Sequence, residues 1–191
     1  GGPDSLALTA LAKSYSYENK CKIYYVLVDH NLRKNSSIEA ISVKRLLKKK
    51  QINLDILKNK ELIKKNIQSE ARRIRYSLLT NFCKKRKIEI ILTAHNLEDQ
   101  VETFFIRLSR GSGLQGLSSM KQINKINNNV HLARPLLDFK KIQLIKISKV
   151  VFGKFYKDPT NKNTKYLRTR IRNLKKSLET SGINYDQVFR S

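Results

Sequence analysis

The feature that most constrains the fold is a regular alternation of short apolar, β-branched segments with amphipathic segments of helical period. Strands are expected over residues 22–28 (KIYYVLV), 52–57 and 88–93 (IEIILT), each bounded by polar residues, and 88–93 is expected to be buried. Helices are expected between and after them, over 36–50, 67–78 and 97–108. Strand and helix in this order predict an α/β fold, a doubly wound and mostly parallel sheet with flanking helices.

Each expected helix has an apolar face with a spacing of three or four residues. These faces are Ile38, Ile41, Val43, Leu46 and Leu47, then Ile67, Ala71, Ile74 and Leu78, then Leu97, Val101, Phe104 and Leu108. Ser36-Ser37-Ile38-Glu39 has the pattern of a capping box at the start of the first of them.

A further helix, over 6–13, follows the loop Gly1-Gly2-Pro3-Asp4-Ser5. Because a loop of this kind normally follows a strand, we expect the first strand of the sheet to lie upstream of residue 1.

The pattern changes after residue 110. A Gly- and Ser-rich segment at 110–120 and a polar turn at 124–129 lead to an extended segment at 130–137. A helix is expected from Asp138 to about Val151, then a turn at Asp158-Pro159-Thr160-Asn161, and then a basic helix from Tyr166 to about Thr180. We therefore divide the chain into a main α/β domain (1–137) and a helical extension (138–191) that completes it and starts a linker toward further domains.

Charge indicates the partner. The chain has 40 Lys and Arg against 15 Asp and Glu, a net charge of +25. An AT-biased coding sequence would raise the lysine count, but it would not explain so few acids. The surplus therefore predicts a nucleic-acid partner, which a basic surface attracts through counterion release.

Composition also excludes several classes of protein. No apolar stretch approaches the roughly 20 residues of a membrane span, and the first residues do not resemble a secretory signal. Cys21 and Cys83 form no CxxC pair, which argues against a disulfide scaffold, a zinc site or an iron–sulfur cluster. We expect a cytoplasmic protein that does not bind membranes.

Polar residues gather where strands are expected to end. Asp29-His30 closes one strand, Ala94-His95-Asn96 closes another, and Gly1–Ser5 opens the first helix. In a doubly wound sheet these positions surround the ligand cleft. The Gly1–Ser5 loop suits a phosphate, since glycines allow close approach and a helix N-terminus attracts anions, although an ordinary helix start would look the same.

A second candidate site follows the strand at 88–93. His95, Asp99 and Glu102 are spaced i, i+4 and i+7, which on a helix places them on one face, away from Leu97 and Val101. That face could bind a divalent metal or a cationic substrate, or transfer protons; a solvated helix face is the alternative. The GxGxxG match at 111–116 follows a helix and not a strand, so we interpret it as a loop over the cleft, with Arg107 and Arg110 as phosphate contacts.

The order of the motifs resembles that of the tRNA(Ile)-lysidine synthetase family, N-type ATP pyrophosphatases with a PP-loop and an adenine nucleotide alpha hydrolase-like fold. The motifs are Gly1-Gly2-Pro3-Asp4-Ser5, Val28-Asp29-His30-Asn31-Leu32-Arg33, Glu70-Ala71-Arg72 with Arg75-Tyr76, Thr93-Ala94-His95-Asn96 with Asp99 and Glu102-Thr103, Arg110-Gly111-Ser112-Gly113 with Gly116-Leu117, Arg134-Pro135-Leu136-Leu137, and Asp158-Pro159-Thr160-Asn161 with Arg168 and Arg172. They span nearly the whole chain.

The resemblance implies a ligase that uses ATP and Mg²⁺. The C2 oxygen of the wobble cytidine in a CAU-anticodon isoleucine tRNA is adenylated, with release of pyrophosphate; the ε-amine of free L-lysine then attacks C2 and expels AMP. Residues 1–137 would be the PP-loop catalytic domain. The resemblance leaves the oligomeric state open, with a homodimer as one option.

The resemblance also implies roles for individual residues. Asp4, His95, Asp99 and Glu102 would be catalytic, with His95 near the reacting phosphate and Asp4 near the metal. ATP would be bound by Gly1, Gly2, Pro3, Asp4, Ser5, Asp29, Arg75 and Ala94. Asp99 and Glu102 would receive the lysine ammonium group, and Arg110, Arg168 and Arg172 would contact phosphates of ATP or tRNA.

The sequence departs from the family at both ends. The first Ser of the SGGxDS loop and the strand before it are absent, as are the C-terminal tRNA-binding domains, so we expect a catalytic-domain fragment with little activity alone. Two alternatives remain: a related tRNA thiolase, for which Cys21 and Cys83 form no suitable motif, and a non-catalytic basic tRNA-binding protein. A synthetase of the amidotransferase type that does not act on tRNA would leave the charge unexplained.

Overall fold

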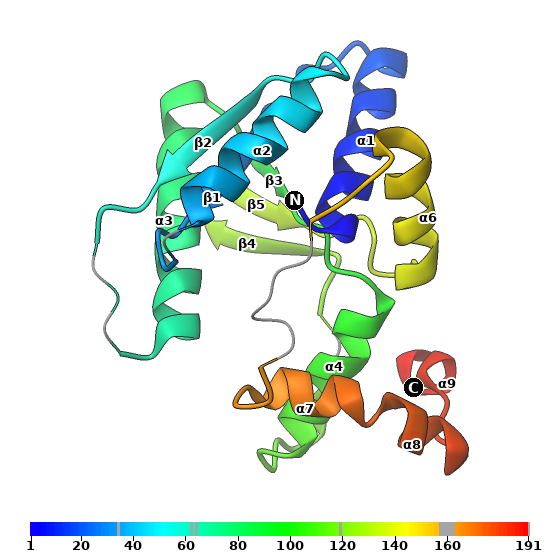
Figure 1. The fold of residues 1–191 in the computed structure, drawn as a ribbon. Helices are drawn as coiled ribbons and strands as arrows, with labels where there is room; N and C mark the ends of the chain where they lie inside the picture. Colours follow the sequence, from blue (N-terminus) through cyan, green and yellow to red (C-terminus); the bar gives the residue numbers. More distant parts are fainter. Residues whose placement is uncertain (34, 62, 64, 119, 157–162, 191) are drawn as a thin grey trace.

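The computed structural model describes residues 1–190 with the exception of 34, 62, 64, 119 and 157–162. Its helices are α1 (Pro3–Glu18), α2 (Ser36–Lys48), α3 (Ile67–Arg86), α4 (Leu97–Leu108), α5 (Leu114–Leu117), α6 (Lys141–Phe152), α7 (Leu167–Asn173), α8 (Lys175–Thr180) and α9 (Tyr185–Arg190). Its strands are β1 (Tyr25–Asp29), β2 (Leu54–Lys58), β3 (Ile90–Leu92), β4 (Ile123–Asn127) and β5 (Val130–Ala133) (Figure 1). The predicted α/β class is confirmed.

The strands form parallel pairs joined through helices. β1 pairs with β2 with Tyr25 opposite Leu54, and β3 pairs with β5 with Ile90 opposite His131. β4 adds to β5 as an antiparallel hairpin. Because β1 and β3 both lead into polar loops at their carboxyl ends, the residues that follow them are available for a site.

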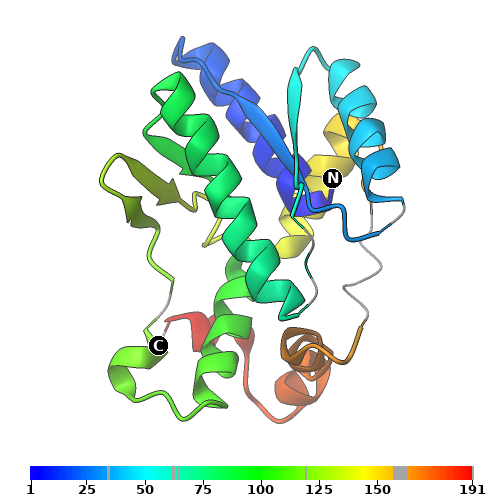
Figure 2. The ribbon, with the colours of Figure 1, turned by 90° about the vertical axis from the view of Figure 1, so that its left-hand side faces the viewer.

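Helices cover the strands on opposite faces. Leu6 of α1, Val43 and Leu47 of α2 and Phe152 of α6 pack with Leu54 of β2 in one apolar cluster. On the other side, Cys83 of α3 packs against Ile91, Val130 and Leu132 of β3 and β5. Figure 2 shows α3 in front of α1 and α6. Burial of one such side chain contributes about 1.5–3 kcal/mol.

The last three helices gather around α4 (Figure 1). Leu97 and Val101 of α4 form a cluster with the buried Tyr185 of α9, and Phe105 and Leu178 pack at its edge. α6 instead packs on α1, where Leu144 contacts Ala7 and Leu136. The helices after residue 137 thus support two different parts of the α/β domain, and the boundary at 137 stays a prediction.

Two predictions for α2 were wrong. Ile38 and Ile41 are 63% and 44% exposed, and Ala40 takes part in the buried face with Val43, Leu46 and Leu47. The Ser36–Glu39 capping box is not formed, and Asn35 is the N-cap residue. The Ser37 hydroxyl donates to Asp29, and Glu39 pairs with Arg33, so tertiary partners replace the local pair.

Other element boundaries differ from the sequence expectation. The strand expected over 88–93 is shorter, and only Ile91 is buried, with Ile90 and Leu92 57% and 39% exposed. The polar segment 124–129, expected as a turn, supplies most of β4, and a short helix, α5, lies in the loop expected over 110–120. α6 begins at Lys141 instead of Asp138, and the helix expected from Tyr166 to Thr180 is divided at Leu174. The turn predicted at 158–161 lies outside the described residues. Within the described ranges, no helix has both the length and the apolar composition needed to cross a membrane.

Candidate active site

The first turn of α1 carries the glycine loop. Gly2 is the N-cap and Pro3 the first helical residue, which suits proline because that position needs no N–H donor. No side chain caps this end among the described residues. Gly1 is closely packed: a Cβ there would lie 2.5 Å from Val43 Cγ2, whereas at Gly2 the nearest atom would be the Tyr156 carbonyl oxygen at 4.0 Å.

The first turn of α4 is fixed by a capping box. The Asn96 side chain accepts from the Asp99 main-chain N–H at 3.0 Å, and the Asp99 carboxylate accepts from the Asn96 N–H at 3.2 Å. The helix therefore starts at Leu97, and His95 lies in the connection before it. The expectation of His95 on the same helix as Asp99 and Glu102 was wrong, because Asn96 ends the helix on its N-terminal side.

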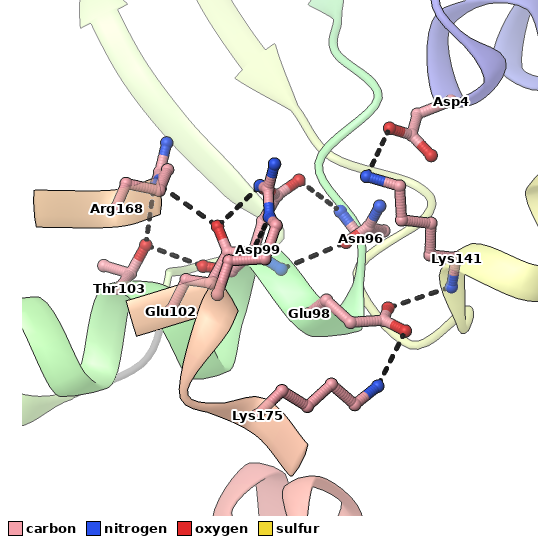
Figure 3. Close-up of polar contacts among 10 residues, drawn as sticks. Asp4, Asn96, Glu98, Asp99, Glu102, Thr103, Lys141, Arg168 and Lys175 are labelled. Carbon is pink, nitrogen blue, oxygen red and sulfur yellow. Dashed lines mark hydrogen bonds and ion pairs between the residues drawn. The ribbon is translucent and has the colours of Figure 1, made fainter. Parts of the chain in front are cut away.

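Three acids meet where these two helices begin. Asp4 of α1 lies near Glu98 and Asp99 of α4. Lys141, at the start of α6, lies between Asp4 and Glu98, and its Nζ is 3.8 Å from Asp4 Oδ2 (Figure 3). The main-chain N–H of Lys141 donates to Glu98 at 2.9 Å, and Lys175 approaches the other Glu98 oxygen at 3.7 Å. In a chain of net charge +25, this is a local concentration of negative charge.

Asp4 has an oxygen that suits a cation. Its Oδ1 is buried without a hydrogen-bond partner in the described structure. Burial raises the pKa of the Asp4 carboxyl, against the opposing charge of Lys141, and the charge of Asp99 raises it further. No group of three or more His, Cys, Asp or Glu in the described part of the chain is arranged to hold a metal ion, so protein side chains alone do not make a metal cage here.

Glu102 is buried one turn further along α4. Its two oxygens accept from Arg172 Nε at 2.6 Å and Nη2 at 2.9 Å, and Arg168 Nε lies 3.4 Å away. Arg168 also donates to the Thr103 hydroxyl at 3.1 Å. Burial raises the pKa of the Glu102 carboxyl against the pull of Arg172, while the hydrogen bond to Glu102 raises the pKa of Arg172. Glu102 thus ties α7 to α4, and both arginines face this carboxylate.

The residues predicted at the end of β1 form a separate group. Asp29 is buried and accepts from the Ser37 hydroxyl at 2.6 Å and the Asn31 N–H at 3.0 Å. Burial raises its pKa, but these hydrogen bonds outweigh burial and lower the pKa overall. Arg75 of α3 donates to His30 Nε2 at 3.3 Å. Asp29 therefore shapes the loop after β1, and Arg75 is held beside it.

The remaining predicted residues lie around α4. Ala94 is half-buried between β3 and α4, and Arg110 is exposed in the turn after α4. The Nδ1 atom of His95 forms a hydrogen bond with the Thr93 hydroxyl at 3.0 Å. Burial lowers the pKa of His95 to about 4, the charges of Arg134, Arg72 and Arg168 lower it as well, and only Asp99 opposes them. The imidazole is therefore neutral at pH 7.

Sequence reasoning missed two positions. Lys141 was one lysine among many, and no local pattern singled it out. Gln100 is buried and holds the main chain of Met120 with both ends of its amide: Nε2 donates to the carbonyl at 2.9 Å and Oε1 accepts from the N–H at 2.7 Å. Arg107 donates to the Ser118 carbonyl on the same loop.

A solved structure resembles this fold. The U34-tRNA thiolase NcsA from Methanococcus maripaludis with its [4Fe-4S] cluster aligns with all of this chain and 68% of its own, with a TM-score of 0.76 and 17% identity. At that identity the likeness shows the fold alone.

Curated relatives are similar over most of the chain. The tRNA(Ile)-lysidine synthase of Orientia tsutsugamushi is 41% identical over 181 residues, 93% of this chain and 40% of that protein. The tRNA(Ile)-lysidine synthases of Wolbachia pipientis wMel and Rickettsia rickettsii are 38% and 37% identical over 98% and 90% of the chain, and 44% and 36% of their own lengths. The chain thus spans less than half the length of these relatives. The family model described as the PP-loop domain matches residues 1–178. This chain therefore belongs to the PP-loop family.

Proposed function

We propose that this chain is the catalytic part of a tRNA(Ile)-lysidine synthetase, which uses ATP and free L-lysine to modify the wobble cytidine of a CAU-anticodon isoleucine tRNA. The observation that carries the proposal is the approach of Asp99 to Asp4 of the glycine loop, in a strongly basic chain. Lysine is a cationic substrate and tRNA a polyanion, and this distribution of charge suits both. The similarity to relatives named tRNA(Ile)-lysidine synthase supports it.

In this proposal the first turn of α1 binds the pyrophosphate part of ATP. Its main-chain N–H groups have no side-chain cap, and the helix dipole favours an anion there. Asp4 would hold Mg²⁺ through its unpartnered Oδ1, with ATP oxygens as further ligands, as is usual for a magnesium ion bound by one or two carboxylates. Bound there, Mg²⁺ would neutralise charge on the phosphates. Asp29, Ala94 and Arg75 are proposed to contact the rest of the nucleotide.

The reaction has two steps. The C2 oxygen of cytidine attacks the α-phosphorus of ATP and pyrophosphate leaves. The lysine ε-amine then attacks C2, the C2–oxygen bond breaks so that AMP leaves with that oxygen, and the attacking nitrogen loses a proton to water. His95 would contact the reacting phosphate as a neutral imidazole, since its pKa of about 4 leaves it unprotonated at pH 7.

Asp99 is the carboxylate proposed to receive the lysine ammonium group. Glu102 is the second, and lysine binding there requires its bidentate pair with Arg172 to open. Arg110, Arg168 and Arg172 are proposed as phosphate contacts, the last two after release from Glu102.

The experiment measures ATP–pyrophosphate exchange and incorporation of radiolabelled lysine into a CAU-anticodon isoleucine tRNA transcript. Both the 191-residue chain and a chimera are tested; in the chimera the chain replaces the matching segment of the Orientia tsutsugamushi relative. Asp99→Asn should lower lysine incorporation roughly 10- to 100-fold, the effect of losing a charge-assisted hydrogen bond, and leave pyrophosphate exchange in place.

Glu98→Gln is the matched control. It removes the same charge from the same helical turn, but Glu98 is already engaged by Lys141 and Lys175. We expect both activities to survive this change. Sulfur transfer to tRNA would instead favour the thiolase alternative. That alternative is disfavoured because Cys21 is exposed before β1, whereas Cys83 is buried between α3 and the strands β3 and β5. Binding of tRNA without exchange or incorporation in the chimera would favour the non-catalytic binding protein.

A further inference from the structure

A cavity of about 460 Å³ lies beside His95, between α3, α4, α7 and the β4–β5 hairpin. Five cationic side chains line it: Arg72, Arg107, Lys121, Arg134 and Arg168. No Asp or Glu is among the described residues of its wall, and none of residues 1–5 contributes to it. It is therefore separate from the glycine loop and has an excess of positive charge.

The protein leaves most of that charge uncompensated. Arg107 donates to the Ser118 carbonyl, and Arg134 donates to the Lys121 carbonyl at 2.7 Å and the Asn124 side-chain oxygen at 3.0 Å, all of them neutral groups. Of the five cations, only Arg168 has a carboxylate partner among the described residues, and it shares Glu102 with Arg172.

Arg134 has a donor that no group of the described structure accepts from. The residue is 6% exposed, and its Nε is buried without a hydrogen-bond partner in the described structure. Burial and the charge of Arg72 lower its pKa. A buried guanidinium with a spare donor, surrounded by other cations, is stabilised by an anion with several acceptor oxygens.

We propose that this cavity binds a backbone phosphate of the RNA substrate, next to the nucleotide that reacts. The inference rests on the proposed function, since it places a phosphodiester beside His95. An RNA strand is a better occupant than ATP, because no residue of the glycine loop lines the cavity and because the exposed side chains of Arg72 and Lys121 lie at its wall. Several cations that contact phosphates at one cavity fix the position of a strand, whereas contacts with the bases would determine which sequence binds.

The test is the salt dependence of binding to an anticodon stem-loop RNA with the CAU anticodon. Arg72→Gln combined with Lys121→Gln removes two cavity cations that are exposed, so the fold should be kept. Each phosphate contact to a single strand contributes about 0.7 to the slope of log K against log salt. Loss of the one phosphate contact proposed here should therefore lower the slope by about 0.7 and the affinity about fivefold at 0.1 M salt.

The control combines Lys84→Gln on α3 with Lys125→Gln on β4. These lysines are exposed and do not line the cavity; Lys84 lies on the same helix as Arg72, and Lys125 lies four residues after Lys121. The control loses the same total charge, and its affinity should change by no more than about threefold because distant charges are screened. Equal slopes for the cavity variant and the control would overturn the proposal.

Two further measurements separate this inference from its neighbours. Titration with ATP and with pyrophosphate should give unchanged affinities for the cavity variant; if these fall and RNA binding does not, the cavity serves the nucleotide and the proposal fails. If the wild-type chimera incorporates no lysine but its RNA binding depends on the cavity, the proposed function fails and this inference stands. If the chimera incorporates lysine and the cavity variant binds RNA as the wild type does, the proposed function stands and this inference fails.

Discussion

Replacing Glu102 with glutamine should destabilise the protein, because one buried carboxylate holds α7 against α4. Its two oxygens accept from Arg172 at 2.6 and 2.9 Å, and Arg168 lies 3.4 Å away. Glutamine keeps the shape and one acceptor, but it removes the charge and turns an NH₂ group toward a guanidinium. Both arginines would then repel each other without a shared anion.

The exposure of the partners sets the magnitude. Breaking a fully buried pair costs about 3–5 kcal/mol, and breaking an exposed pair about 0–1 kcal/mol. The Glu102 side chain is 2% exposed, but those of Arg172 and Arg168 are 33% and 42% exposed and can be rehydrated. The loss should therefore be about 2 kcal/mol, or roughly 4–8 °C in Tm for a chain of this size.

Thermal and urea denaturation measure this loss, with Glu39→Gln as control. Glu39 pairs with Arg33 at 2.9 Å, but both side chains are about as exposed as Arg172 and Arg168. Its loss should cost less than about 0.5 kcal/mol. A Glu102→Gln protein as stable as the Glu39→Gln protein would refute the reasoning, since burial of the carboxylate is the difference between the two pairs.

Two further predictions concern stability. The pKa of His95 is about 4 in the folded protein and 6.5 ordinarily, so the unfolded chain takes up the proton first; stability is complete above pH 6.5 and is lost as the pH falls toward 4. At pH 4.5 the wild-type protein should have lost about 2–3 kcal/mol of its free energy of unfolding through this protonation, and the His95→Gln protein should not show that loss. Urea unfolding measures both proteins across this pH range, and an equal dependence of stability on pH would contradict the prediction. Gly1→Ala places a methyl group 2.5 Å from Val43 Cγ2 and should cost at least about 1 kcal/mol, whereas Gly2→Ala has room and should lower Tm far less; thermal denaturation of the two variants compares them directly.

The acidic part of the site followed from the sequence for a general reason. Loops at the carboxyl ends of parallel strands and the starts of the helices after them converge on one edge of the sheet. Asp4 and Asp99 were each placed at such a point, and the structure brings them together with Glu98. The contact of Lys141 with Asp4 depends on how α6 packs on α1, and no local pattern reports that packing.

Local signals failed where tertiary partners competed with them. Ser37 was expected within a local cap, but it donates to Asp29 at the end of β1, which lies close by only in the folded chain. Strand β4 is rich in Asn and Lys, which have low strand propensity, and it forms because β5 offers a complete edge to pair with. His95 lies outside α4 because Asn96 has better partners as an N-cap than as a helical residue.

The amide of Gln100 makes with Met120 the same pair of bonds that a neighbouring strand residue would make. Met120 lies in a loop, yet its N–H can exchange with solvent only when its hydrogen bond to the Gln100 side chain is broken. Since Gln100 is buried within α4, release of the loop and opening of that helix should occur as one event. The Met120 N–H should then undergo hydrogen–deuterium exchange at the same rate as the amides at the centre of α4.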